Sequence, residues 1–322
     1  MSHLTREQRY TIASMLQNGY NQKEIALVIK KDKSVVSREI RHNADARSGV
    51  YRDDLAHRKY LKRQEYKAKP RTFTPEVEEY VRDRLRLKHS PEQIAGVAKK
   101  NGDKCVSHER IYQFIWQDKR KKGTLYLDLR NRGRRYKKRS VIYDKRGIIP
   151  NRTDISQRPP EVELRERFGD LEIDLIIGKN HKGAILTIND RATGFGKLRK
   201  LDGKDAQQLA TATIDCLMEW KPFLKTITSD NGKEFAAHEL VAKHLNIDFF
   251  FAKPYASWQR GSNENFNRLV RQYIPKKVDF DCIPTDYINF VEYQLNNRPR
   301  KRFKYESPMF MFNQLSFIFL FF

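Results

Sequence analysis

The chain has 322 residues, enough for two or three domains, and 64 Lys and Arg against 40 Asp and Glu give it a net charge of +24. This charge favours a polyanionic partner, with nucleic acid as the first candidate and an anionic membrane surface as the competing one. No apolar run approaches the roughly 18 residues of a spanning helix, and the N-terminus lacks a signal-peptide pattern. The scattered cysteines form no Cys-x-x-Cys pair, which argues against a disulfide framework and a structural zinc site. We therefore expect a cytoplasmic protein without a membrane partner.

Residues 1–45 predict a helix-turn-helix DNA-binding domain, because residues 4–43 show the pattern of three short helices. Asn21, followed three residues later by Glu24, predicts a capped second helix. Ser34 is expected to cap the third helix, which would lie in the major groove of DNA. A generic helical bundle is the alternative interpretation. The exposed side chains of the third helix are the predicted DNA contacts: Ser37, Arg38 and Arg41.

Residues 46–73 are polar and basic and predict a helical connector. A second helix-turn-helix-like domain is predicted over residues 74–120, where Ser90-Pro91-Glu92-Gln93 combines an N-cap, a proline at the first helical position and a glutamine that completes a capping box. A turn at residues 101–103 precedes a further amphipathic helix. Its exposed side chains are the predicted base or phosphate contacts: His108, Arg110 and Gln113.

Residues 121–164 form a strongly basic linker, centred on residues 132–139. Such dense runs of like charge repel one another and rarely fold alone, and a phosphate backbone would neutralise them. We therefore predict DNA contacts here, with Arg134 and Arg135 as the candidates. A solvated linker without DNA contacts is the alternative. Arg158-Pro159-Pro160 marks the boundary of the next domain.

From Phe168 onward the hydrophobic pattern changes to short strands. Antiparallel strands followed by alternating helices and strands predict a mixed, five-stranded α/β sheet covered on both faces. We assign this core to residues 165–300 and a C-terminal tail, ending in a Phe-rich segment, to residues 301–322. The strands are predicted at residues 171–177, 184–188, 196–201, 225–228 and 247–251, and helices at residues 205–220 and 238–245.

Three carboxylates stand out in the predicted core. Asp174 lies within the first strand, Asp230 follows the fourth strand, and Glu264 lies in a segment of helical periodicity. Mg²⁺ prefers oxygen ligands and keeps most of its water, so a few carboxylates and a substrate phosphate can hold a pair of ions. On the helix, Glu264 shares one face with Arg268 and Arg271, which predicts a metal-binding acid beside two phosphate-binding arginines. A solvated charged face is the alternative interpretation.

The carboxylates occur in ordered motifs: Glu172-Ile173-Asp174, then the segment 229–235, then the segment 261–267, followed by Leu295-Asn296-Asn297-Arg298-Pro299-Arg300. With the two helix-turn-helix patterns, this set resembles the DDE transposases of bacterial insertion sequences, specifically the IS-thirty (insertion sequence thirty) family, over nearly the whole chain. The resemblance implies a multidomain protein in which all-α helix-turn-helix modules precede a ribonuclease-H-like, retroviral-integrase-like α/β core. It implies that Asp174, Asp230 and Glu264 are catalytic and bind two Mg²⁺ ions, for which Mn²⁺ can substitute.

The activity implied by this resemblance is nicking of double-stranded DNA at terminal inverted repeats, followed by strand transfer into target DNA. Paired ends imply a homodimer or higher multimer on DNA, located in the bacterial cytoplasm with the nucleoid. One departure from the family is Asp170-Leu171 in place of a frequent His-Trp pair. Asp170 could face the same side of a strand as Asp174, but the family register favours Asp174. The alternative function is a catalytically decayed DNA-binding regulator. A general metal-dependent nuclease would leave the two DNA-reading modules unexplained.

Overall fold

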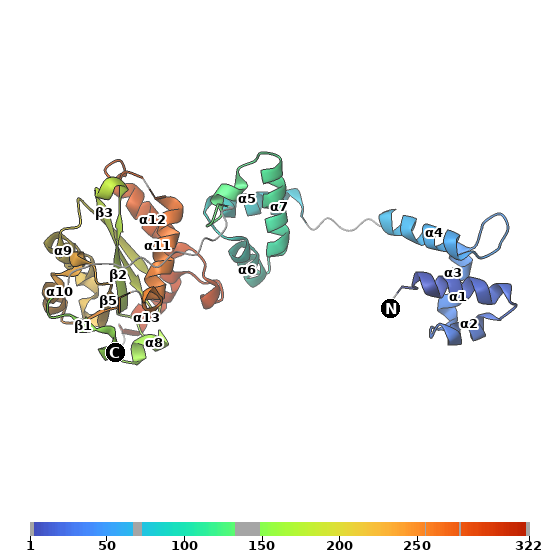
Figure 1. The fold of residues 1–322 in the computed structure, drawn as a ribbon, viewed down its shortest axis with the longest axis horizontal. Helices are drawn as coiled ribbons and strands as arrows, with labels where there is room; N and C mark the ends of the chain where they lie inside the picture. The colour runs from blue at the N-terminus through green and yellow to red at the C-terminus, as the bar shows by residue number, and fades with distance from the viewer. Residues whose placement is uncertain (1–2, 67–72, 133–148, 255, 277, 320–322) are drawn as a thin grey trace. The chain divides into compact units, whose positions relative to one another are not determined.

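The computed structural model describes residues 3–66, 73–132, 149–254, 256–276 and 278–319. The chain divides into two compact units, residues 1–71 and residues 72–322 (Figure 1). Within the described ranges, we find no helix whose length and apolar character would let it cross a membrane.

The first unit is a small helical bundle. Its core contains Ile12, Ile25 and Val36, each 0 % exposed, and also Ala56 from the fourth helix. The helix predicted within the connector therefore packs against the predicted helix-turn-helix. The four helices are α1 (Arg6–Gln17), α2 (Gln22–Val28), α3 (Lys33–Asn43) and α4 (Asp53–Tyr66).

Helix caps fix where these helices begin. The predicted cap of α2 is confirmed, because Asn21 and Glu24 form a reciprocal capping box. The predicted cap of α3 at Ser34 is wrong. Asp32 caps this helix instead, and its Oδ1 accepts a hydrogen bond from the Ser34 backbone N–H at 2.7 Å. Aspartate and serine are equally good N-caps, so the earlier of the two residues starts the helix.

The second unit begins with three helices and the 3₁₀ helix η1 (Leu125–Asp128). The capping box predicted at Ser90 and Gln93 is present, with Pro91 at the first helical position. Five fully buried side chains form the centre of this helical module: Val81, Leu85, Ile94, Ile111 and Ile115. The helices are α5 (Pro75–Arg86), α6 (Pro91–Asn101) and α7 (His108–Arg120).

The rest of the second unit is built on a mixed sheet with the strand order β1-β6-β5-β2-β3-β4. β1, β6, β5 and β2 run parallel, whereas β3 and β4 are antiparallel to their neighbours. The predicted ribonuclease-H-like fold class is confirmed, but the predicted number of five strands is wrong by one. β1 is only two residues long and lies in a polar stretch, so it carries no hydrophobic periodicity. The strands are β1 (Thr153–Asp154), β2 (Asp170–Ile177), β3 (Ala184–Asp190), β4 (Gly196–Leu201), β5 (Thr226–Ser229) and β6 (Asp248–Phe251).

Helices cover both faces of this sheet (Figure 1). Because side chains alternate along a strand, Ile173 and Leu175 of β2 enter the core on one face, whereas Asp174 and Ile176 lie on the other. The first face packs against α9 (Ala206–Leu217), α10 (His238–Leu245) and α13 (Pro308–Phe319), and the second against α11 (Gly261–Tyr273) and α12 (Thr285–Asn297). Asp174 therefore faces the helix that carries Glu264.

The segment after residue 300 contributes to the core of the second unit. The Phe312 ring of α13 lies 5.2 Å from the Phe168 ring, 4.6 Å from the Phe195 ring and 5.3 Å from the Trp220 ring, measured between centroids. Aromatic contacts at such distances are favourable beyond the area that they bury. Residues 301–322 thus include a packed helix, and the side chains of the Phe-rich end lie outside the described residues.

Polar contacts join the helical module of the second unit to the sheet domain. The Arg298 side chain is buried and donates from Nε to Gln93 Oε1 at 3.1 Å and from Nη1 to Gln272 Oε1 at 2.8 Å. Gln272 Nε2 in turn donates to the Asp128 carbonyl at 2.6 Å. Burial lowers the pKa of Arg298 to about 10, so its guanidinium is still charged at neutral pH. This network ties α6 and η1 to the C-terminal ends of α11 and α12.

Candidate active site

Asp174 is held in place by one neighbour on its own strand and one on α11. Its Oδ1 accepts a hydrogen bond from the Leu175 backbone N–H, and its Oδ2 accepts one from Asn267 Nδ2, both at 2.8 Å. Burial raises the pKa of Asp174 to about 6, and the nearby Arg260 opposes this rise. The carboxyl group of Asp174 therefore loses its proton at a higher pH than an exposed aspartate does.

Asp230 lies beside Asp174 because β5 and β2 are parallel neighbours. Thr228 is in register with Glu172, and continuing this register by two residues brings Asp230 level with Asp174. Asp230 Oδ1 accepts a hydrogen bond from the Gly232 backbone N–H at 2.9 Å, which closes a tight turn after β5. The two aspartates therefore lie on neighbouring strands at the same level of the sheet.

One guanidinium bridges these two carboxylates. Arg260, at the end of the 3₁₀ helix η6 (Ser257–Arg260), places Nη1 3.6 Å from Asp174 Oδ2 and Nη2 3.5 Å from Asp230 Oδ2. Its Nη1 also donates to the Ile173 carbonyl at 3.2 Å. The carboxylates of Asp174 and Asp230 therefore both face the positive charge of Arg260.

Glu264, the third predicted acid, does not join the other two. Its side chain is exposed on α11, and within the described ranges no three His, Cys, Asp or Glu side chains gather closely enough to hold a metal ion. Arg260 and Asn267 lie four residues before and three residues after Glu264, on the same helical stripe. Arg260 contacts both aspartates and Asn267 contacts Asp174.

The chemistry of the site fits a hard divalent cation. Carboxylate oxygens are the donors that Mg²⁺ prefers, and two of them converge here. Next to them, Asn267 Oδ1 is buried and has no hydrogen-bond partner among the described residues, and the same holds for Arg260 Nε. A buried polar atom without a partner is costly, so an added ion with its water shell would satisfy atoms that the protein leaves unpaired.

The acids before Asp174 on β2 have structural partners. Glu172 is 0 % exposed, forms an ion pair with Arg191 and accepts the Asn263 backbone N–H at 2.7 Å. Asp170 pairs with Arg167 at 2.7 Å. Both carboxylates are therefore occupied by ion pairs within the protein. Asp174 is the acid of this strand that faces Asp230.

The predicted arginines of α11 differ in their surroundings. Arg268 is exposed. Arg271 is half-buried and donates to the Ile177 carbonyl at 3.0 Å and to the Pro275 carbonyl at 3.4 Å, and burial lowers its pKa. Its guanidinium ties α11 to the end of β2, so Arg268 is the more available of the two for a DNA phosphate.

The other predicted DNA contacts lie on two helices and in one stretch outside the described residues. Ser37, Arg38 and Arg41 are exposed on α3, and His108 and Gln113 are exposed on α7.

Arg110 of α7 is half-buried, with its guanidinium 5.1 Å from the centroid of the Phe73 ring. This cation–π contact holds the side chain against its own module. Arg134 and Arg135 fall outside the described residues, and their predicted role stays a prediction.

Arg260 and Asn267 are the site residues that the sequence prediction missed. A signal for both was available, because residues 260, 264 and 267 share one face of a helix that begins near residue 260. What the pattern could not show is that α11 presents this face to Asp174. That contact depends on how the helix packs across β2 and β3.

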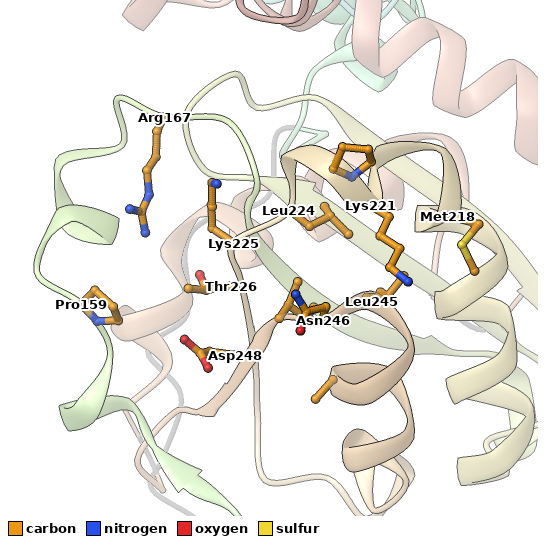
Figure 2. Close-up of a pocket in the computed structure, with 13 residues that line it drawn as sticks. Pro159, Arg167, Met218, Lys221, Leu224, Lys225, Thr226, Leu245, Asn246 and Asp248 are labelled. Carbon is orange, nitrogen blue, oxygen red and sulfur yellow. The ribbon is translucent and has the colours of Figure 1, made fainter. Parts of the chain in front are cut away.

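A pocket of about 940 Å³ lies elsewhere on the sheet domain, and Figure 2 shows the side chains that line it. Lys225, Thr226 and Asp248 are among them, at the starts of β5 and β6. Asp230 follows the other end of β5, on the order of 13 Å away at about 3.3 Å per residue. The pocket is therefore separate from the carboxylates.

Comparisons with known proteins agree with this architecture. Residues 1–43 match the family model described as a helix-turn-helix domain. The chain is 52 % identical over 313 residues to the transposase for insertion sequence element IS4351 of Bacteroides fragilis, covering 97 % of this chain and 96 % of the relative. It is 32 % identical over 314 residues to the transposase for IS1086 of Cupriavidus metallidurans (94 % and 92 % covered) and 30 % identical over 321 residues to transposase InsI for IS30C of Escherichia coli (96 % and 82 % covered). The chain belongs to the family of insertion-sequence transposases.

Proposed function

We propose that this transposase nicks DNA at the terminal inverted repeats of its own insertion sequence and joins the ends to target DNA by two-metal phosphoryl transfer. The observation that carries the proposal is the convergence of Asp174 and Asp230 on one positive charge, within 3.6 Å of the same guanidinium. The similarity to transposases over more than nine tenths of the chain supports the same assignment.

In this proposal, Asp174 and Asp230 hold the metal ions, and Glu264 completes the set from the neighbouring helix. When bound, the ions supply activation of the attacking oxygen and stabilisation of the leaving oxygen in an in-line displacement. Asn267 orients Asp174 through its 2.8 Å hydrogen bond. Arg260 neutralises the two aspartates in the absence of metal and competes with the ions for them.

DNA recognition in the proposal is divided between the helical modules. The exposed side chains of α3 and α7 would contact the terminal repeats, and Arg268 would contact a phosphate near the active site. The relatives are named as transposases. Target joining requires two ends to be held together, so the proposed active species is a homodimer or higher multimer on DNA.

A DNA-binding regulator without cleavage activity is the second candidate. It is favoured by the exposed position of Glu264, which leaves the two aspartates paired with Arg260 and Asn267. The two candidates share DNA binding and differ in whether Glu264 has any role in chemistry.

The test uses a labelled duplex that carries the terminal repeat flanking the gene, incubated with Mg²⁺ or with EDTA. Wild-type protein is compared with Glu264→Gln, and Glu239→Gln of α10, also an exposed glutamate, is the matched control. We expect Mg²⁺-dependent nicking at the end of the repeat by wild type and by the control, and binding without nicking by Glu264→Gln. Specific binding without nicking by wild type, in Mg²⁺ and in Mn²⁺, would favour the regulator.

A further inference from the structure

A second cavity, of about 310 Å³, lies beside the first turns of α11 on the side away from Asp174. Ser262 and Asn265 of α11 line it. At about 100° per residue, they lie roughly opposite the helical stripe of Arg260, Glu264 and Asn267. The cavity and the paired aspartates are therefore on different sides of the same helix.

Four cationic side chains from two other segments line the cavity: Arg165, which precedes β2, and Arg300, Lys301 and Arg302 at the 3₁₀ helix η7 (Lys301–Phe303). Within the described parts of the chain, none of these four forms an ion pair with a carboxylate.

The hydrogen bonds of two of these arginines go to neutral groups. Arg302 donates to the Arg191 carbonyl at 3.3 Å and Arg300 donates to the Leu295 carbonyl at 2.9 Å. Burial and the neighbouring guanidiniums of Arg298 and Arg302 lower the pKa of Arg300, but an arginine stays protonated at neutral pH. The carboxylates of Asp190 and Glu172 act on Arg302 from a distance, but no described carboxylate forms an ion pair with any of the four cations. The cavity therefore concentrates positive charge.

A hydroxyl group in the cavity wall also lacks a partner. Ser262 Oγ is buried and forms no hydrogen bond with any residue in the part of the chain that the structure describes. An unpaired buried hydroxyl costs free energy, and a hydroxyl can donate to an anionic oxygen. Several cations without an ion-pair partner and a hydroxyl donor in one cavity are together the components of a phosphate site.

We infer that this cavity binds one phosphate of the DNA backbone at a position away from the cleaved bond. The inference rests on the proposed function, since it places the same DNA duplex across α11. A helix with its side chains is about 10–12 Å wide, and phosphates of one strand advance about 3.4 Å along the DNA axis. The contacted phosphate would therefore lie at least about three nucleotides from the bond that is cut.

The test is a scan in which single phosphates of the terminal-repeat duplex are replaced by neutral methylphosphonates, with binding measured in EDTA. Lys301→Gln and Arg165→Gln each remove one exposed cavity charge, whereas Lys304→Gln removes an exposed charge three residues beyond Lys301 and outside the cavity. For wild type and Lys304→Gln, we expect a position, a few nucleotides from the nick, where neutralisation weakens binding. For both cavity variants we expect this effect to be lost and the slope of log affinity against log salt to fall by about 1.

The inference is overturned if both cavity variants keep the wild-type profile and the wild-type salt slope. It is also overturned if Lys304→Gln lowers the slope as much as they do, because general surface charge would then explain the effect. Binding in EDTA does not depend on cleavage. A failure of this inference would therefore leave the nicking result intact, and a failure to nick would not alter the binding profile.

Discussion

Replacing Glu172 by Gln should lower the free energy of unfolding of the sheet domain more than replacing an exposed glutamate does. Glu172 is 0 % exposed and joins three parts of the site: its own strand β2, Arg191 in the turn between β3 and β4, and the Asn263 backbone N–H in the first turn of α11. The side-chain amide introduced by Glu172→Gln could still accept the hydrogen bond from Asn263. It could not neutralise Arg191, whose side chain is 1 % exposed.

The size of the effect follows from this burial. Removing one partner of a buried ion pair costs about 3–5 kcal/mol, because the other charge is left uncompensated. Arg191 keeps a contact with Glu163 at 2.9 Å, but Glu163 is 63 % exposed, and pairs with exposed partners contribute only about 0–1 kcal/mol. With the Asn263 hydrogen bond retained, we expect a loss near the lower end, about 3 kcal/mol.

The assay is urea unfolding followed by the fluorescence of Trp220, which is buried in the sheet domain, in a background with Trp116→Phe and Trp258→Phe. The matched control is Glu78→Gln, whose side chain is 39 % exposed and pairs with Arg82 at 2.7 Å; it should cost less than about 1 kcal/mol. Equal losses for the two variants would show that the buried Glu172–Arg191 pair contributes no more than an exposed pair.

Three further outcomes follow from the site. Burial raises the pKa of Asp174 from 3.8 to about 6, so ionisation of this carboxyl lowers the stability of the fold as pH rises through this interval. Asp174→Asn should therefore raise the free energy of unfolding in EDTA at pH 7 but not at pH 3. An equal change at both pH values would contradict this. Arg260→Gln removes the cation that bridges the aspartates, so Mn²⁺ titrated without DNA should bind more tightly than to wild type; unchanged or weaker binding would contradict the competition. Gly196→Ala would place its Cβ 2.2 Å from the Phe266 ring of α11 and should cost about 1–3 kcal/mol in urea unfolding, whereas Gly203→Ala, with nothing within 4 Å, should change stability little.

The parts of the fold that repeat a local pattern could be predicted from the sequence. β2, β3 and β4 were predicted because apolar residues recur along each of them between turns, and their bounds differ from the prediction by at most two residues at either end. β1 could not be predicted, because two polar residues have no periodicity and pair only through the presence of β6. The cap at Asp32 was missed for a different reason: two nearby residues were equally able to cap α3, and the local sequence does not rank them.

The candidate site shows the same division. Asp174 and Asp230 were predicted from their positions relative to strands, and strand register brings them side by side. The roles of Arg260 and Asn267 depend on tertiary packing, since only the docking of α11 on β2 and β3 brings them to the aspartates. The contact of Arg271 with main-chain carbonyls likewise depends on that docking. The role of Glu264 stays a prediction from the motif.

In the proposed mechanism, a metal ion held by these carboxylates contacts the phosphate that is cut. The most direct test is a terminal-repeat duplex in which one non-bridging oxygen of that phosphate is replaced by sulfur, with each stereoisomer assayed separately. Softer ligands favour Mn²⁺ over Mg²⁺. We predict that at least one stereoisomer resists nicking in Mg²⁺ and is nicked again in Mn²⁺. Equal nicking of both stereoisomers and of the unmodified duplex in Mg²⁺ would contradict it.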